Sequence, residues 1–185
     1  MSDTTIWADA FPHDFEVAHE RTLRGLSKVG ERVYYPGARR DGGRDGAWLR
    51  ITASTGRVWT GVFASDLVAG RLSVIASWPE PSTLLVAVGG GPYLVDTRDP
   101  DAWSRLDRPT VRRFDPQPDL GLALLLDDEA LSAYDADGLA WESGLLGPDA
   151  SWLGRLDDEV HLRDGDRLHR VSLRHGRTVS EPASW

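Results

Sequence analysis

Two stretches of the same length decide the fold: residues 84–103, LLVAVGGGPYLVDTRDPDAW, and residues 122–141, LALLLDDEALSAYDADGLAW. The second begins thirty-eight residues after the first. Each contains an apolar run, a turn of three small or acidic residues, a second apolar run, and a Trp after a further turn. Short apolar runs that alternate with turn residues are typical of β-strands. The sequence therefore predicts a repeated unit of three strands.

A third copy is predicted to begin at Trp152, because Leu156–Val160 (LDDEV) repeats Leu126–Ala130 (LDDEA) at an offset of thirty. A unit this small cannot bury both of its faces alone, so such units stack or arrange radially. We therefore expect an all-β chain of antiparallel repeated sheets, arranged as a small or partial β-propeller of three to four blades. A β-sandwich is the alternative.

The N-terminal part shows a different pattern. Residues 14–29 fit one short helix, although Phe15, Val17 and His19 also alternate as a strand would. Residues 36–46 contain four glycines and five charged side chains, and are expected to form a flexible Gly/Arg loop. The length of 185 residues predicts one β-rich domain, 1–185.

Residues 133–141 (AYDADGLAW) resemble the strand–turn–strand of quinoprotein-type propeller blades, in which an Asp, a Gly turn and a Trp recur. Residues 52–59 (TASTGRVW) are similar, but they lack the Asp and are one residue shorter. The resemblance is local and implies sheet geometry. It does not imply the quinone chemistry, because no cofactor residues match.

The composition excludes several classes of partner. With 21 basic and 29 acidic residues the net charge is −8, which disfavours nucleic acids and anionic membranes. There is no cysteine, and Lys28 is the only lysine among the basic residues. This arginine bias is typical of a GC-rich bacterial genome. The first nine residues do not resemble a signal peptide, so we expect a cytoplasmic, bacterial protein.

No sequence pattern supports a catalytic or metal site. Residues 89–91 (GGG) lead into a strand-like segment, whereas a phosphate cradle opens a helix. The acidic clusters lack the regular spacing of calcium loops, and the five histidines lack zinc spacing. We therefore expect no cofactor and no metal, and an enzyme is the less favoured interpretation.

The eight tryptophans provide candidate binding residues. Trp103 and Trp141 occupy repeated positions, which favours a structural role, whereas Trp7, Trp78 and Trp185 are the candidates for exposed anchors. Trp rings near carboxylates also suit a sugar or protein partner. The sequence offers the following candidate site residues: Trp78, Glu80, Asp101, Trp103 and Trp185.

These observations favour a non-enzymatic protein-interaction module, an adaptor or an inhibitory or immunity-type partner, whose acidic surface covers a basic one. The alternative is a carbohydrate- or small-ligand-binding domain, with hydrolysis as a further option. Open sheet edges also allow a homodimer.

Overall fold

The computed structural model describes residues 5–7, 9–20, 31–36, 38, 46–64, 73–88, 91–108 and 111–183. Within these ranges the regular structure is all β, as the sequence predicts for most of the chain, and contains no helix. The chain divides into two compact units, residues 1–109 and 110–185. They are called the N-terminal and C-terminal units below; the prediction of one domain over 1–185 stays a prediction.

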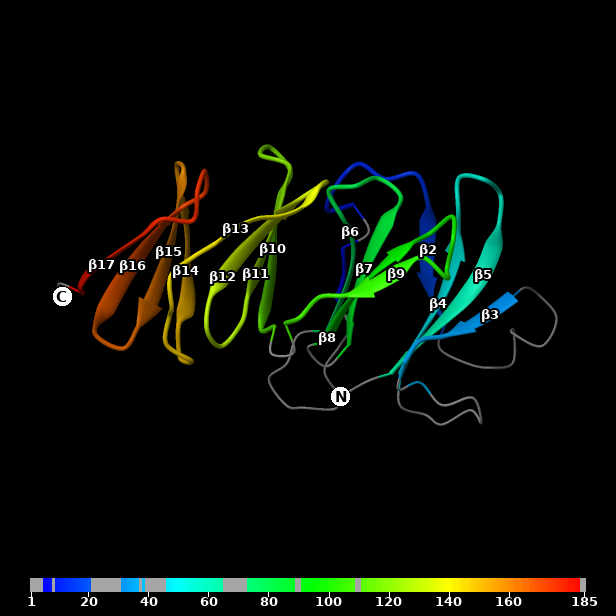
Figure 1. Ribbon diagram of the computed structural model, residues 1–185, viewed down its shortest axis with the longest axis horizontal. Coiled ribbons are helices and arrows are strands. Elements are labelled where there is room, and N and C mark those ends of the chain that lie inside the picture. Colours follow the sequence, from blue (N-terminus) through cyan, green and yellow to red (C-terminus); the bar gives the residue numbers. More distant parts are fainter. Residues whose placement is uncertain are drawn as a thin grey trace. The chain divides into compact units, whose positions relative to one another are not determined.

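Each unit contains two sheets (Figure 1). Sheet I consists, in spatial order, of β2 (Glu16–His19), β4 (Gly46–Thr52), β5 (Val58–Ala64) and β3 (Glu31–Tyr34). Sheet II consists of β1 (Thr5–Trp7), β6 (Ser73–Ser77), β7 (Thr83–Val88), β8 (Gly91–Asp96) and β9 (Trp103–Arg105).

In the C-terminal unit, sheet III consists of β10 (Arg113–Gln117), β11 (Leu122–Leu126), β12 (Leu131–Asp135) and β13 (Gly138–Glu142). Sheet IV consists of β14 (Ser151–Leu156), β15 (Glu159–Asp164), β16 (Arg167–Ser172) and β17 (Thr178–Pro182).

Three antiparallel meanders confirm the predicted repeated sheets: β6–β9, β10–β13 and β14–β17. Each has the four-stranded, sequential order of a propeller blade. Sheet I differs, because β3 pairs in parallel with β5 at its edge. A parallel strand, β1, also extends sheet II beyond β6.

In each unit the two sheets pack face to face around one apolar core. In the N-terminal unit, Leu84, Val86 and Val88 of β7 pack on the apolar face of sheet I, which includes Trp59 and Phe63. In the C-terminal unit, the core between sheets III and IV is formed by the following buried residues: Leu124, Leu126, Leu131, Ala133, Trp141, Leu146, Ala150, Val160, Leu162, Val171 and Leu173.

The repeat offset of thirty-eight is wrong by one residue. An offset of thirty-eight aligns Val86 of sheet II with Leu124 of sheet III. Val86 packs against sheet I, the preceding sheet, whereas Leu124 packs against sheet IV, the following sheet. The correct match comes from the turn after the third strand of each meander. There the side-chain oxygen of Asp96, Asp135 or Ser172 accepts the N–H two residues ahead. These positions lie 39 and 37 residues apart.

Trp103 and Trp141 are therefore not equivalent. Trp103 packs on Tyr35 of the preceding sheet, whereas Trp141 donates from Nε1 to the Leu173 carbonyl of the following sheet at 2.9 Å. One residue of slip reverses the face of every side chain in a strand, so an offset of 38 joins opposite faces.

The repeat at an offset of thirty is also wrong. Leu126–Ala130 joins the second and third strands of sheet III, but Leu156–Val160 joins the first and second strands of sheet IV. Both turns carry acidic residues because Asp tolerates turn dihedrals, so the similarity reflects turn chemistry.

The predicted N-terminal helix is wrong where it can be checked. Residues 16–19 form β2, which pairs antiparallel with β4, so the period-two alternation was the correct signal. Residues 21–30 lie outside the described residues, as does most of the predicted loop 36–46, of which positions 36, 38 and 46 are described.

Candidate functional site

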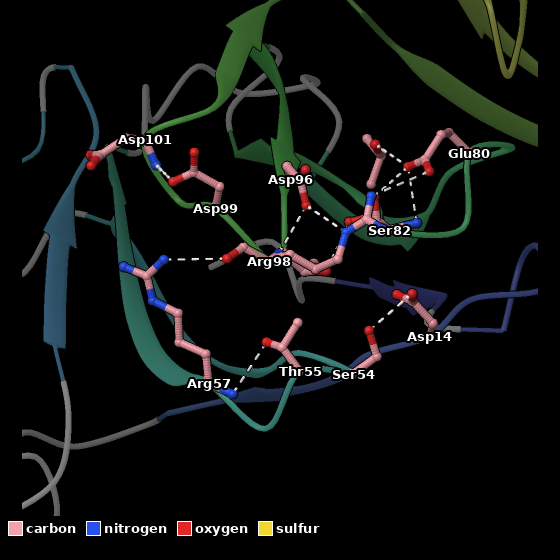
Figure 2. Close-up of polar contacts among 12 residues, drawn as sticks. Asp14, Ser54, Thr55, Arg57, Glu80, Ser82, Asp96, Arg98, Asp99 and Asp101 are labelled. Atoms are coloured by element: carbon pink, nitrogen blue, oxygen red, sulfur yellow. Dashed lines mark hydrogen bonds and ion pairs between the residues drawn. The ribbon is translucent and has the colours of Figure 1, made fainter.

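Polar side chains gather at one end of the N-terminal unit, on the turn after β6 and the longer loop between β8 and β9 (Figure 2). Residues 98–103 of this loop (RDPDAW) are called the acidic–aromatic loop below. All of them are exposed except Pro100. The turn of sheet I that carries Arg57 lies at the same end.

Glu80 closes the turn after β6. Its Oε2 accepts hydrogen bonds from the Ser82 N–H at 2.9 Å, the Ser82 hydroxyl at 2.7 Å and the Thr83 hydroxyl at 2.8 Å. Arg98 donates to the same Ser82 hydroxyl, and its guanidinium lies 3.8 Å from Glu80 Oε1. Arg98 therefore links the turn to the acidic–aromatic loop. The Glu80 carboxylate is occupied by hydrogen bonds within the turn, which gives it a structural role.

Sheet I holds the main chain of the loop in place. The Trp59 indole donates to the Thr97 carbonyl at 2.9 Å, and the Tyr35 hydroxyl donates to the Pro100 carbonyl at 3.0 Å. Arg57 donates to the Arg98 carbonyl at 3.2 Å (Figure 2). Three carbonyl groups of the main chain, at residues 97, 98 and 100, thus accept hydrogen bonds from side chains of another part of the unit, which makes the loop preorganised.

The loop presents two carboxylates to solvent. Asp99 Oδ1 accepts the N–H of Asp101 at 3.3 Å. Neither Asp99 nor Asp101 forms an ion pair with a described side chain, although both charges act on the Arg57 guanidinium. Their negative field reaches the interior. Burial first, and then the charges of Asp101 and Asp99, raise the pKa of Tyr35 far above its ordinary value. Tyr35 therefore stays a neutral hydrogen-bond donor.

Trp103 lies at the end of the loop and packs against a cluster of aromatic rings. Its ring lies edge-on to Tyr35 at 5.8 Å and is tilted against Tyr93 at 6.0 Å. Tyr35 in turn stacks on Phe63 at 4.3 Å. The Trp103 side chain nevertheless remains 39% exposed. A large aromatic ring that is held in place by its neighbours and is still exposed to solvent is typical of an interface anchor.

The structure brings three of the predicted site residues together and removes one. Glu80 lies on the turn after β6, which Arg98 links to the acidic–aromatic loop that contains Asp101 and Trp103. Trp78 is only 3% exposed, so its prediction as an exposed anchor is wrong. The ring packs into the protein although it precedes a Pro-rich turn. Trp185 lies outside the described residues, as does the side chain of Trp7.

Sequence reasoning missed three contributors, namely Asp99, Tyr35 and Arg57. Asp99 was detectable, because Asp-Pro-Asp ahead of a Trp is a turn with two outward carboxylates. Nothing local marks Tyr35 or Arg57, because they act on a loop about 40 or more residues away along the chain.

The described residues contain neither a cluster of metal ligands nor a membrane-spanning helix. Nowhere in the described part of the chain do three or more His, Cys, Asp or Glu side chains gather as a metal ion would require. The same residues include no helix with the length and hydrophobicity needed to cross a bilayer. What the loop can supply is a fixed arrangement of negative charge beside an aromatic surface.

Glu80 gives a pH-dependent prediction. Partial burial opposes its charge, but the hydrogen bonds from Ser82 and Thr83 and the charge of Arg98 outweigh it and lower the pKa of Glu80. A carboxyl whose pKa is lower in the folded state stabilises the fold at neutral pH and loses that effect as the pH falls. We expect Glu80→Gln to remove a measurable part, below about 1 kcal/mol, of the stability that is lost between about pH 5 and pH 3. Urea unfolding at both pH values measures this, and an unchanged loss in the variant would contradict it.

Comparison with known proteins gives no family. No protein-family model matches the chain, and no curated protein matches it. Among solved structures, it is similar to the N-terminal domain of Nup159, with 11% identity and a TM-score of 0.46. It is also similar to a chain of an S. cerevisiae complex of Dbp5 bound to Nup159, Gle1, IP6 and ADP, with 10% identity and a TM-score of 0.46. Both matches cover 98% of this chain but only 53% and 52% of the other chain, so this chain spans about half their length.

Proposed function

We propose that the protein is a protein-interaction module that docks a basic segment of a partner on the acidic–aromatic loop. The finer roles predicted from the sequence, an adaptor or an inhibitory or immunity-type partner in a bacterial cytoplasm, are part of this proposal. The quinoprotein-type resemblance contributes nothing to it beyond sheet geometry.

One observation carries the proposal: the loop backbone is held by hydrogen bonds, yet neither of its two carboxylates forms an ion pair with a described side chain. Tyr35, Trp59 and Arg57 restrain the loop before any partner arrives, so binding costs little ordering entropy. Asp99 and Asp101 remain exposed and without an ion pair to a described residue. A Lys or Arg side chain could meet both carboxylates without first breaking an internal salt bridge.

The surrounding charge supports the same choice of partner. The net charge of −8 attracts basic proteins and accelerates their association at low salt. Trp103 adds an apolar surface that can also receive a cation on its ring face. The negative charge would increase the association rate and orient the basic segment, and the Trp103 ring would provide the buried apolar contact.

The test uses two matched double variants. A fluorescein-labelled peptide of alternating Lys and Ser is titrated with the protein by anisotropy at low salt. We expect Asp99→Asn with Asp101→Asn to weaken binding about tenfold, roughly the value of one or two lost charge pairs. The control, Asp137→Asn with Asp149→Asn, removes the same charge from exposed positions of the C-terminal unit and should weaken binding less than about twofold.

Two results would overturn the proposal. If the wild-type protein does not bind the basic peptide more tightly than its Glu-Ser counterpart, no basic docking surface exists. If both double variants weaken binding equally, the peptide responds to net charge and the loop is not the site.

A carbohydrate-binding function is the second candidate, because Trp103 is half-exposed and Asp101 lies two residues away. A sugar would stack on the ring and donate hydroxyls to the carboxylate. A glycan panel read by Trp fluorescence, with Trp103→Phe as the control, decides this. A spectral change that survives in Trp103→Phe would assign it to another Trp.

A further inference from the structure

The strand that follows the acidic–aromatic loop is an open edge. β9 is the last strand of sheet II and pairs only with β8 among the described strands. All three of its residues, Trp103, Ser104 and Arg105, are exposed. An exposed strand edge offers unpaired main-chain donors and acceptors to an incoming chain.

The hydrogen bonds at the two ends of β9 show which of its main-chain groups face β8. The Ala102 carbonyl accepts from the Asp96 N–H at 2.9 Å, and the Leu106 N–H donates to the Pro92 carbonyl at 3.0 Å. Residues 102 and 106 thus turn their main-chain groups toward β8, as does Ser104 between them. By alternation along the strand, the N–H and C=O groups of Trp103 and Arg105 point away from the sheet.

We propose that β9 receives an extended segment of the partner as an additional, antiparallel strand of sheet II. This proposal deepens the proposed function and rests on it, because the carboxylates of the acidic–aromatic loop would determine which charges the segment must carry. Strand addition uses main-chain hydrogen bonds for affinity and alternate side chains for specificity. The two residues of β9 whose main-chain groups point away from β8 can make four such bonds with an antiparallel chain.

The side chains along the edge define the order of residues in that segment. Trp103 and Arg105 share one face with Tyr93, which pairs directly with Arg105 and whose ring the Arg105 guanidinium covers at 5.6 Å. Asp101 and Asp99 precede Trp103. An antiparallel segment therefore meets Arg105 first, then Trp103, then the two carboxylates. The complementary order, from amino to carboxyl end, is an acidic residue, an apolar residue and a basic residue.

The test peptide follows from this order. Glu-Thr-Val-Thr-Lys-Thr-Lys, acetylated and amidated at its ends, places Glu beside Arg105, Val beside Trp103 and Lys beside Asp101. The reversed sequence has the same composition and charge, and is the matched control. We expect the forward peptide to bind the full chain at least about fivefold more tightly, because only its order pairs every charge when the chains run antiparallel.

Backbone pairing is tested separately from charge. In one version of the forward peptide the amides of Glu, Val and the first Lys are N-methylated, and in the other the amides of the Thr residues. The first set faces β9 in the proposed pairing, so its methylation should weaken binding about tenfold or more, while methylation of the Thr amides should weaken it much less. Hydrogen exchange should slow at the Trp103 and Arg105 amides on binding, but not at Ser104, which already faces β8.

The outcomes separate the two proposals. If the forward peptide binds and loses affinity in Asp99→Asn with Asp101→Asn, but both N-methylated versions bind equally, the loop docks basic chains and strand addition is overturned. If the Trp103 and Arg105 amides are already protected in the free protein, and more so at higher protein concentration, a second copy occupies the edge and the proposal is wrong. If the forward peptide does not bind while the Lys-Ser peptide does, strand addition again fails and the proposed function stands.

Discussion

Trp59→Ala should lower the free energy of unfolding of the N-terminal unit by about 3–5 kcal/mol. The indole is fully buried in the core between sheets I and II. Its removal leaves a cavity that the stacked strands cannot close. It also removes the donor for the Thr97 carbonyl, and Thr97 is itself fully buried, so that oxygen would have no replacement from water.

Two further variants separate these effects. Trp59→Phe keeps an aromatic ring in the core but loses the indole N–H, and we expect it to cost about 1–3 kcal/mol. Leu145→Ala, at a position 85% exposed, should change stability by less than about 0.5 kcal/mol. Urea unfolding followed by far-UV circular dichroism measures all three. A cost below about 1 kcal/mol for Trp59→Ala would show that the two sheets do not pack through this side chain.

Gly176→Ala should destabilise the C-terminal unit by about 2–4 kcal/mol. Gly176 has a φ of +66°, a left-handed conformation that costs alanine about 1–2 kcal/mol. The added Cβ would also lie 2.6 Å from Cε3 of Trp141 and 3.1 Å from the Glu142 carbonyl oxygen. The Trp141 ring would have to move, although it is buried and is tied to the Leu173 carbonyl.

Gly165→Ala is the matched control for this variant. Gly165 has a φ of +59°, so the backbone cost is similar, but nothing lies within 4 Å of its added Cβ. The difference between the two variants in thermal unfolding therefore measures the packing under Trp141 alone. Equal losses of stability would mean that Trp141 moves aside freely, and that the Trp141–Leu173 bond does not fix the position of the ring.

The positions of the turns were predictable because turns are local. The Asp135 side chain accepts hydrogen bonds from the N–H groups of Asp137 and Gly138. All the residues that form this turn lie within four consecutive positions, 135–138 (DADG), so the sequence pattern alone indicates it. The same local signal marked the ends of most strands. It also produced the false repeat between residues 126–130 and 156–160, because identical turn chemistry serves two different connections.

The candidate site was predictable only in part. Asp101 and Trp103 were identified from a carboxylate beside a Trp, and the structure places both on the exposed loop. Trp78 and Glu80 show the same sequence pattern, but Trp78 is buried and Glu80 is held by three hydrogen bonds. Sequence neighbours alone cannot separate the two cases, because burial depends on the facing sheet.

The sequence by itself determined that this chain is built from short strands joined by acidic and glycine turns, because alternation and turn chemistry act within a few residues. The tertiary structure decided which face of each strand is inside, since a slip of one residue between repeats reverses that face. It also decided that Asp99 and Asp101 form no ion pair with a described side chain and lie on a loop whose main chain is held by hydrogen bonds. Their surroundings come from Tyr35, Arg57 and Trp59, about 40 or more residues away, and only folding brings those groups together.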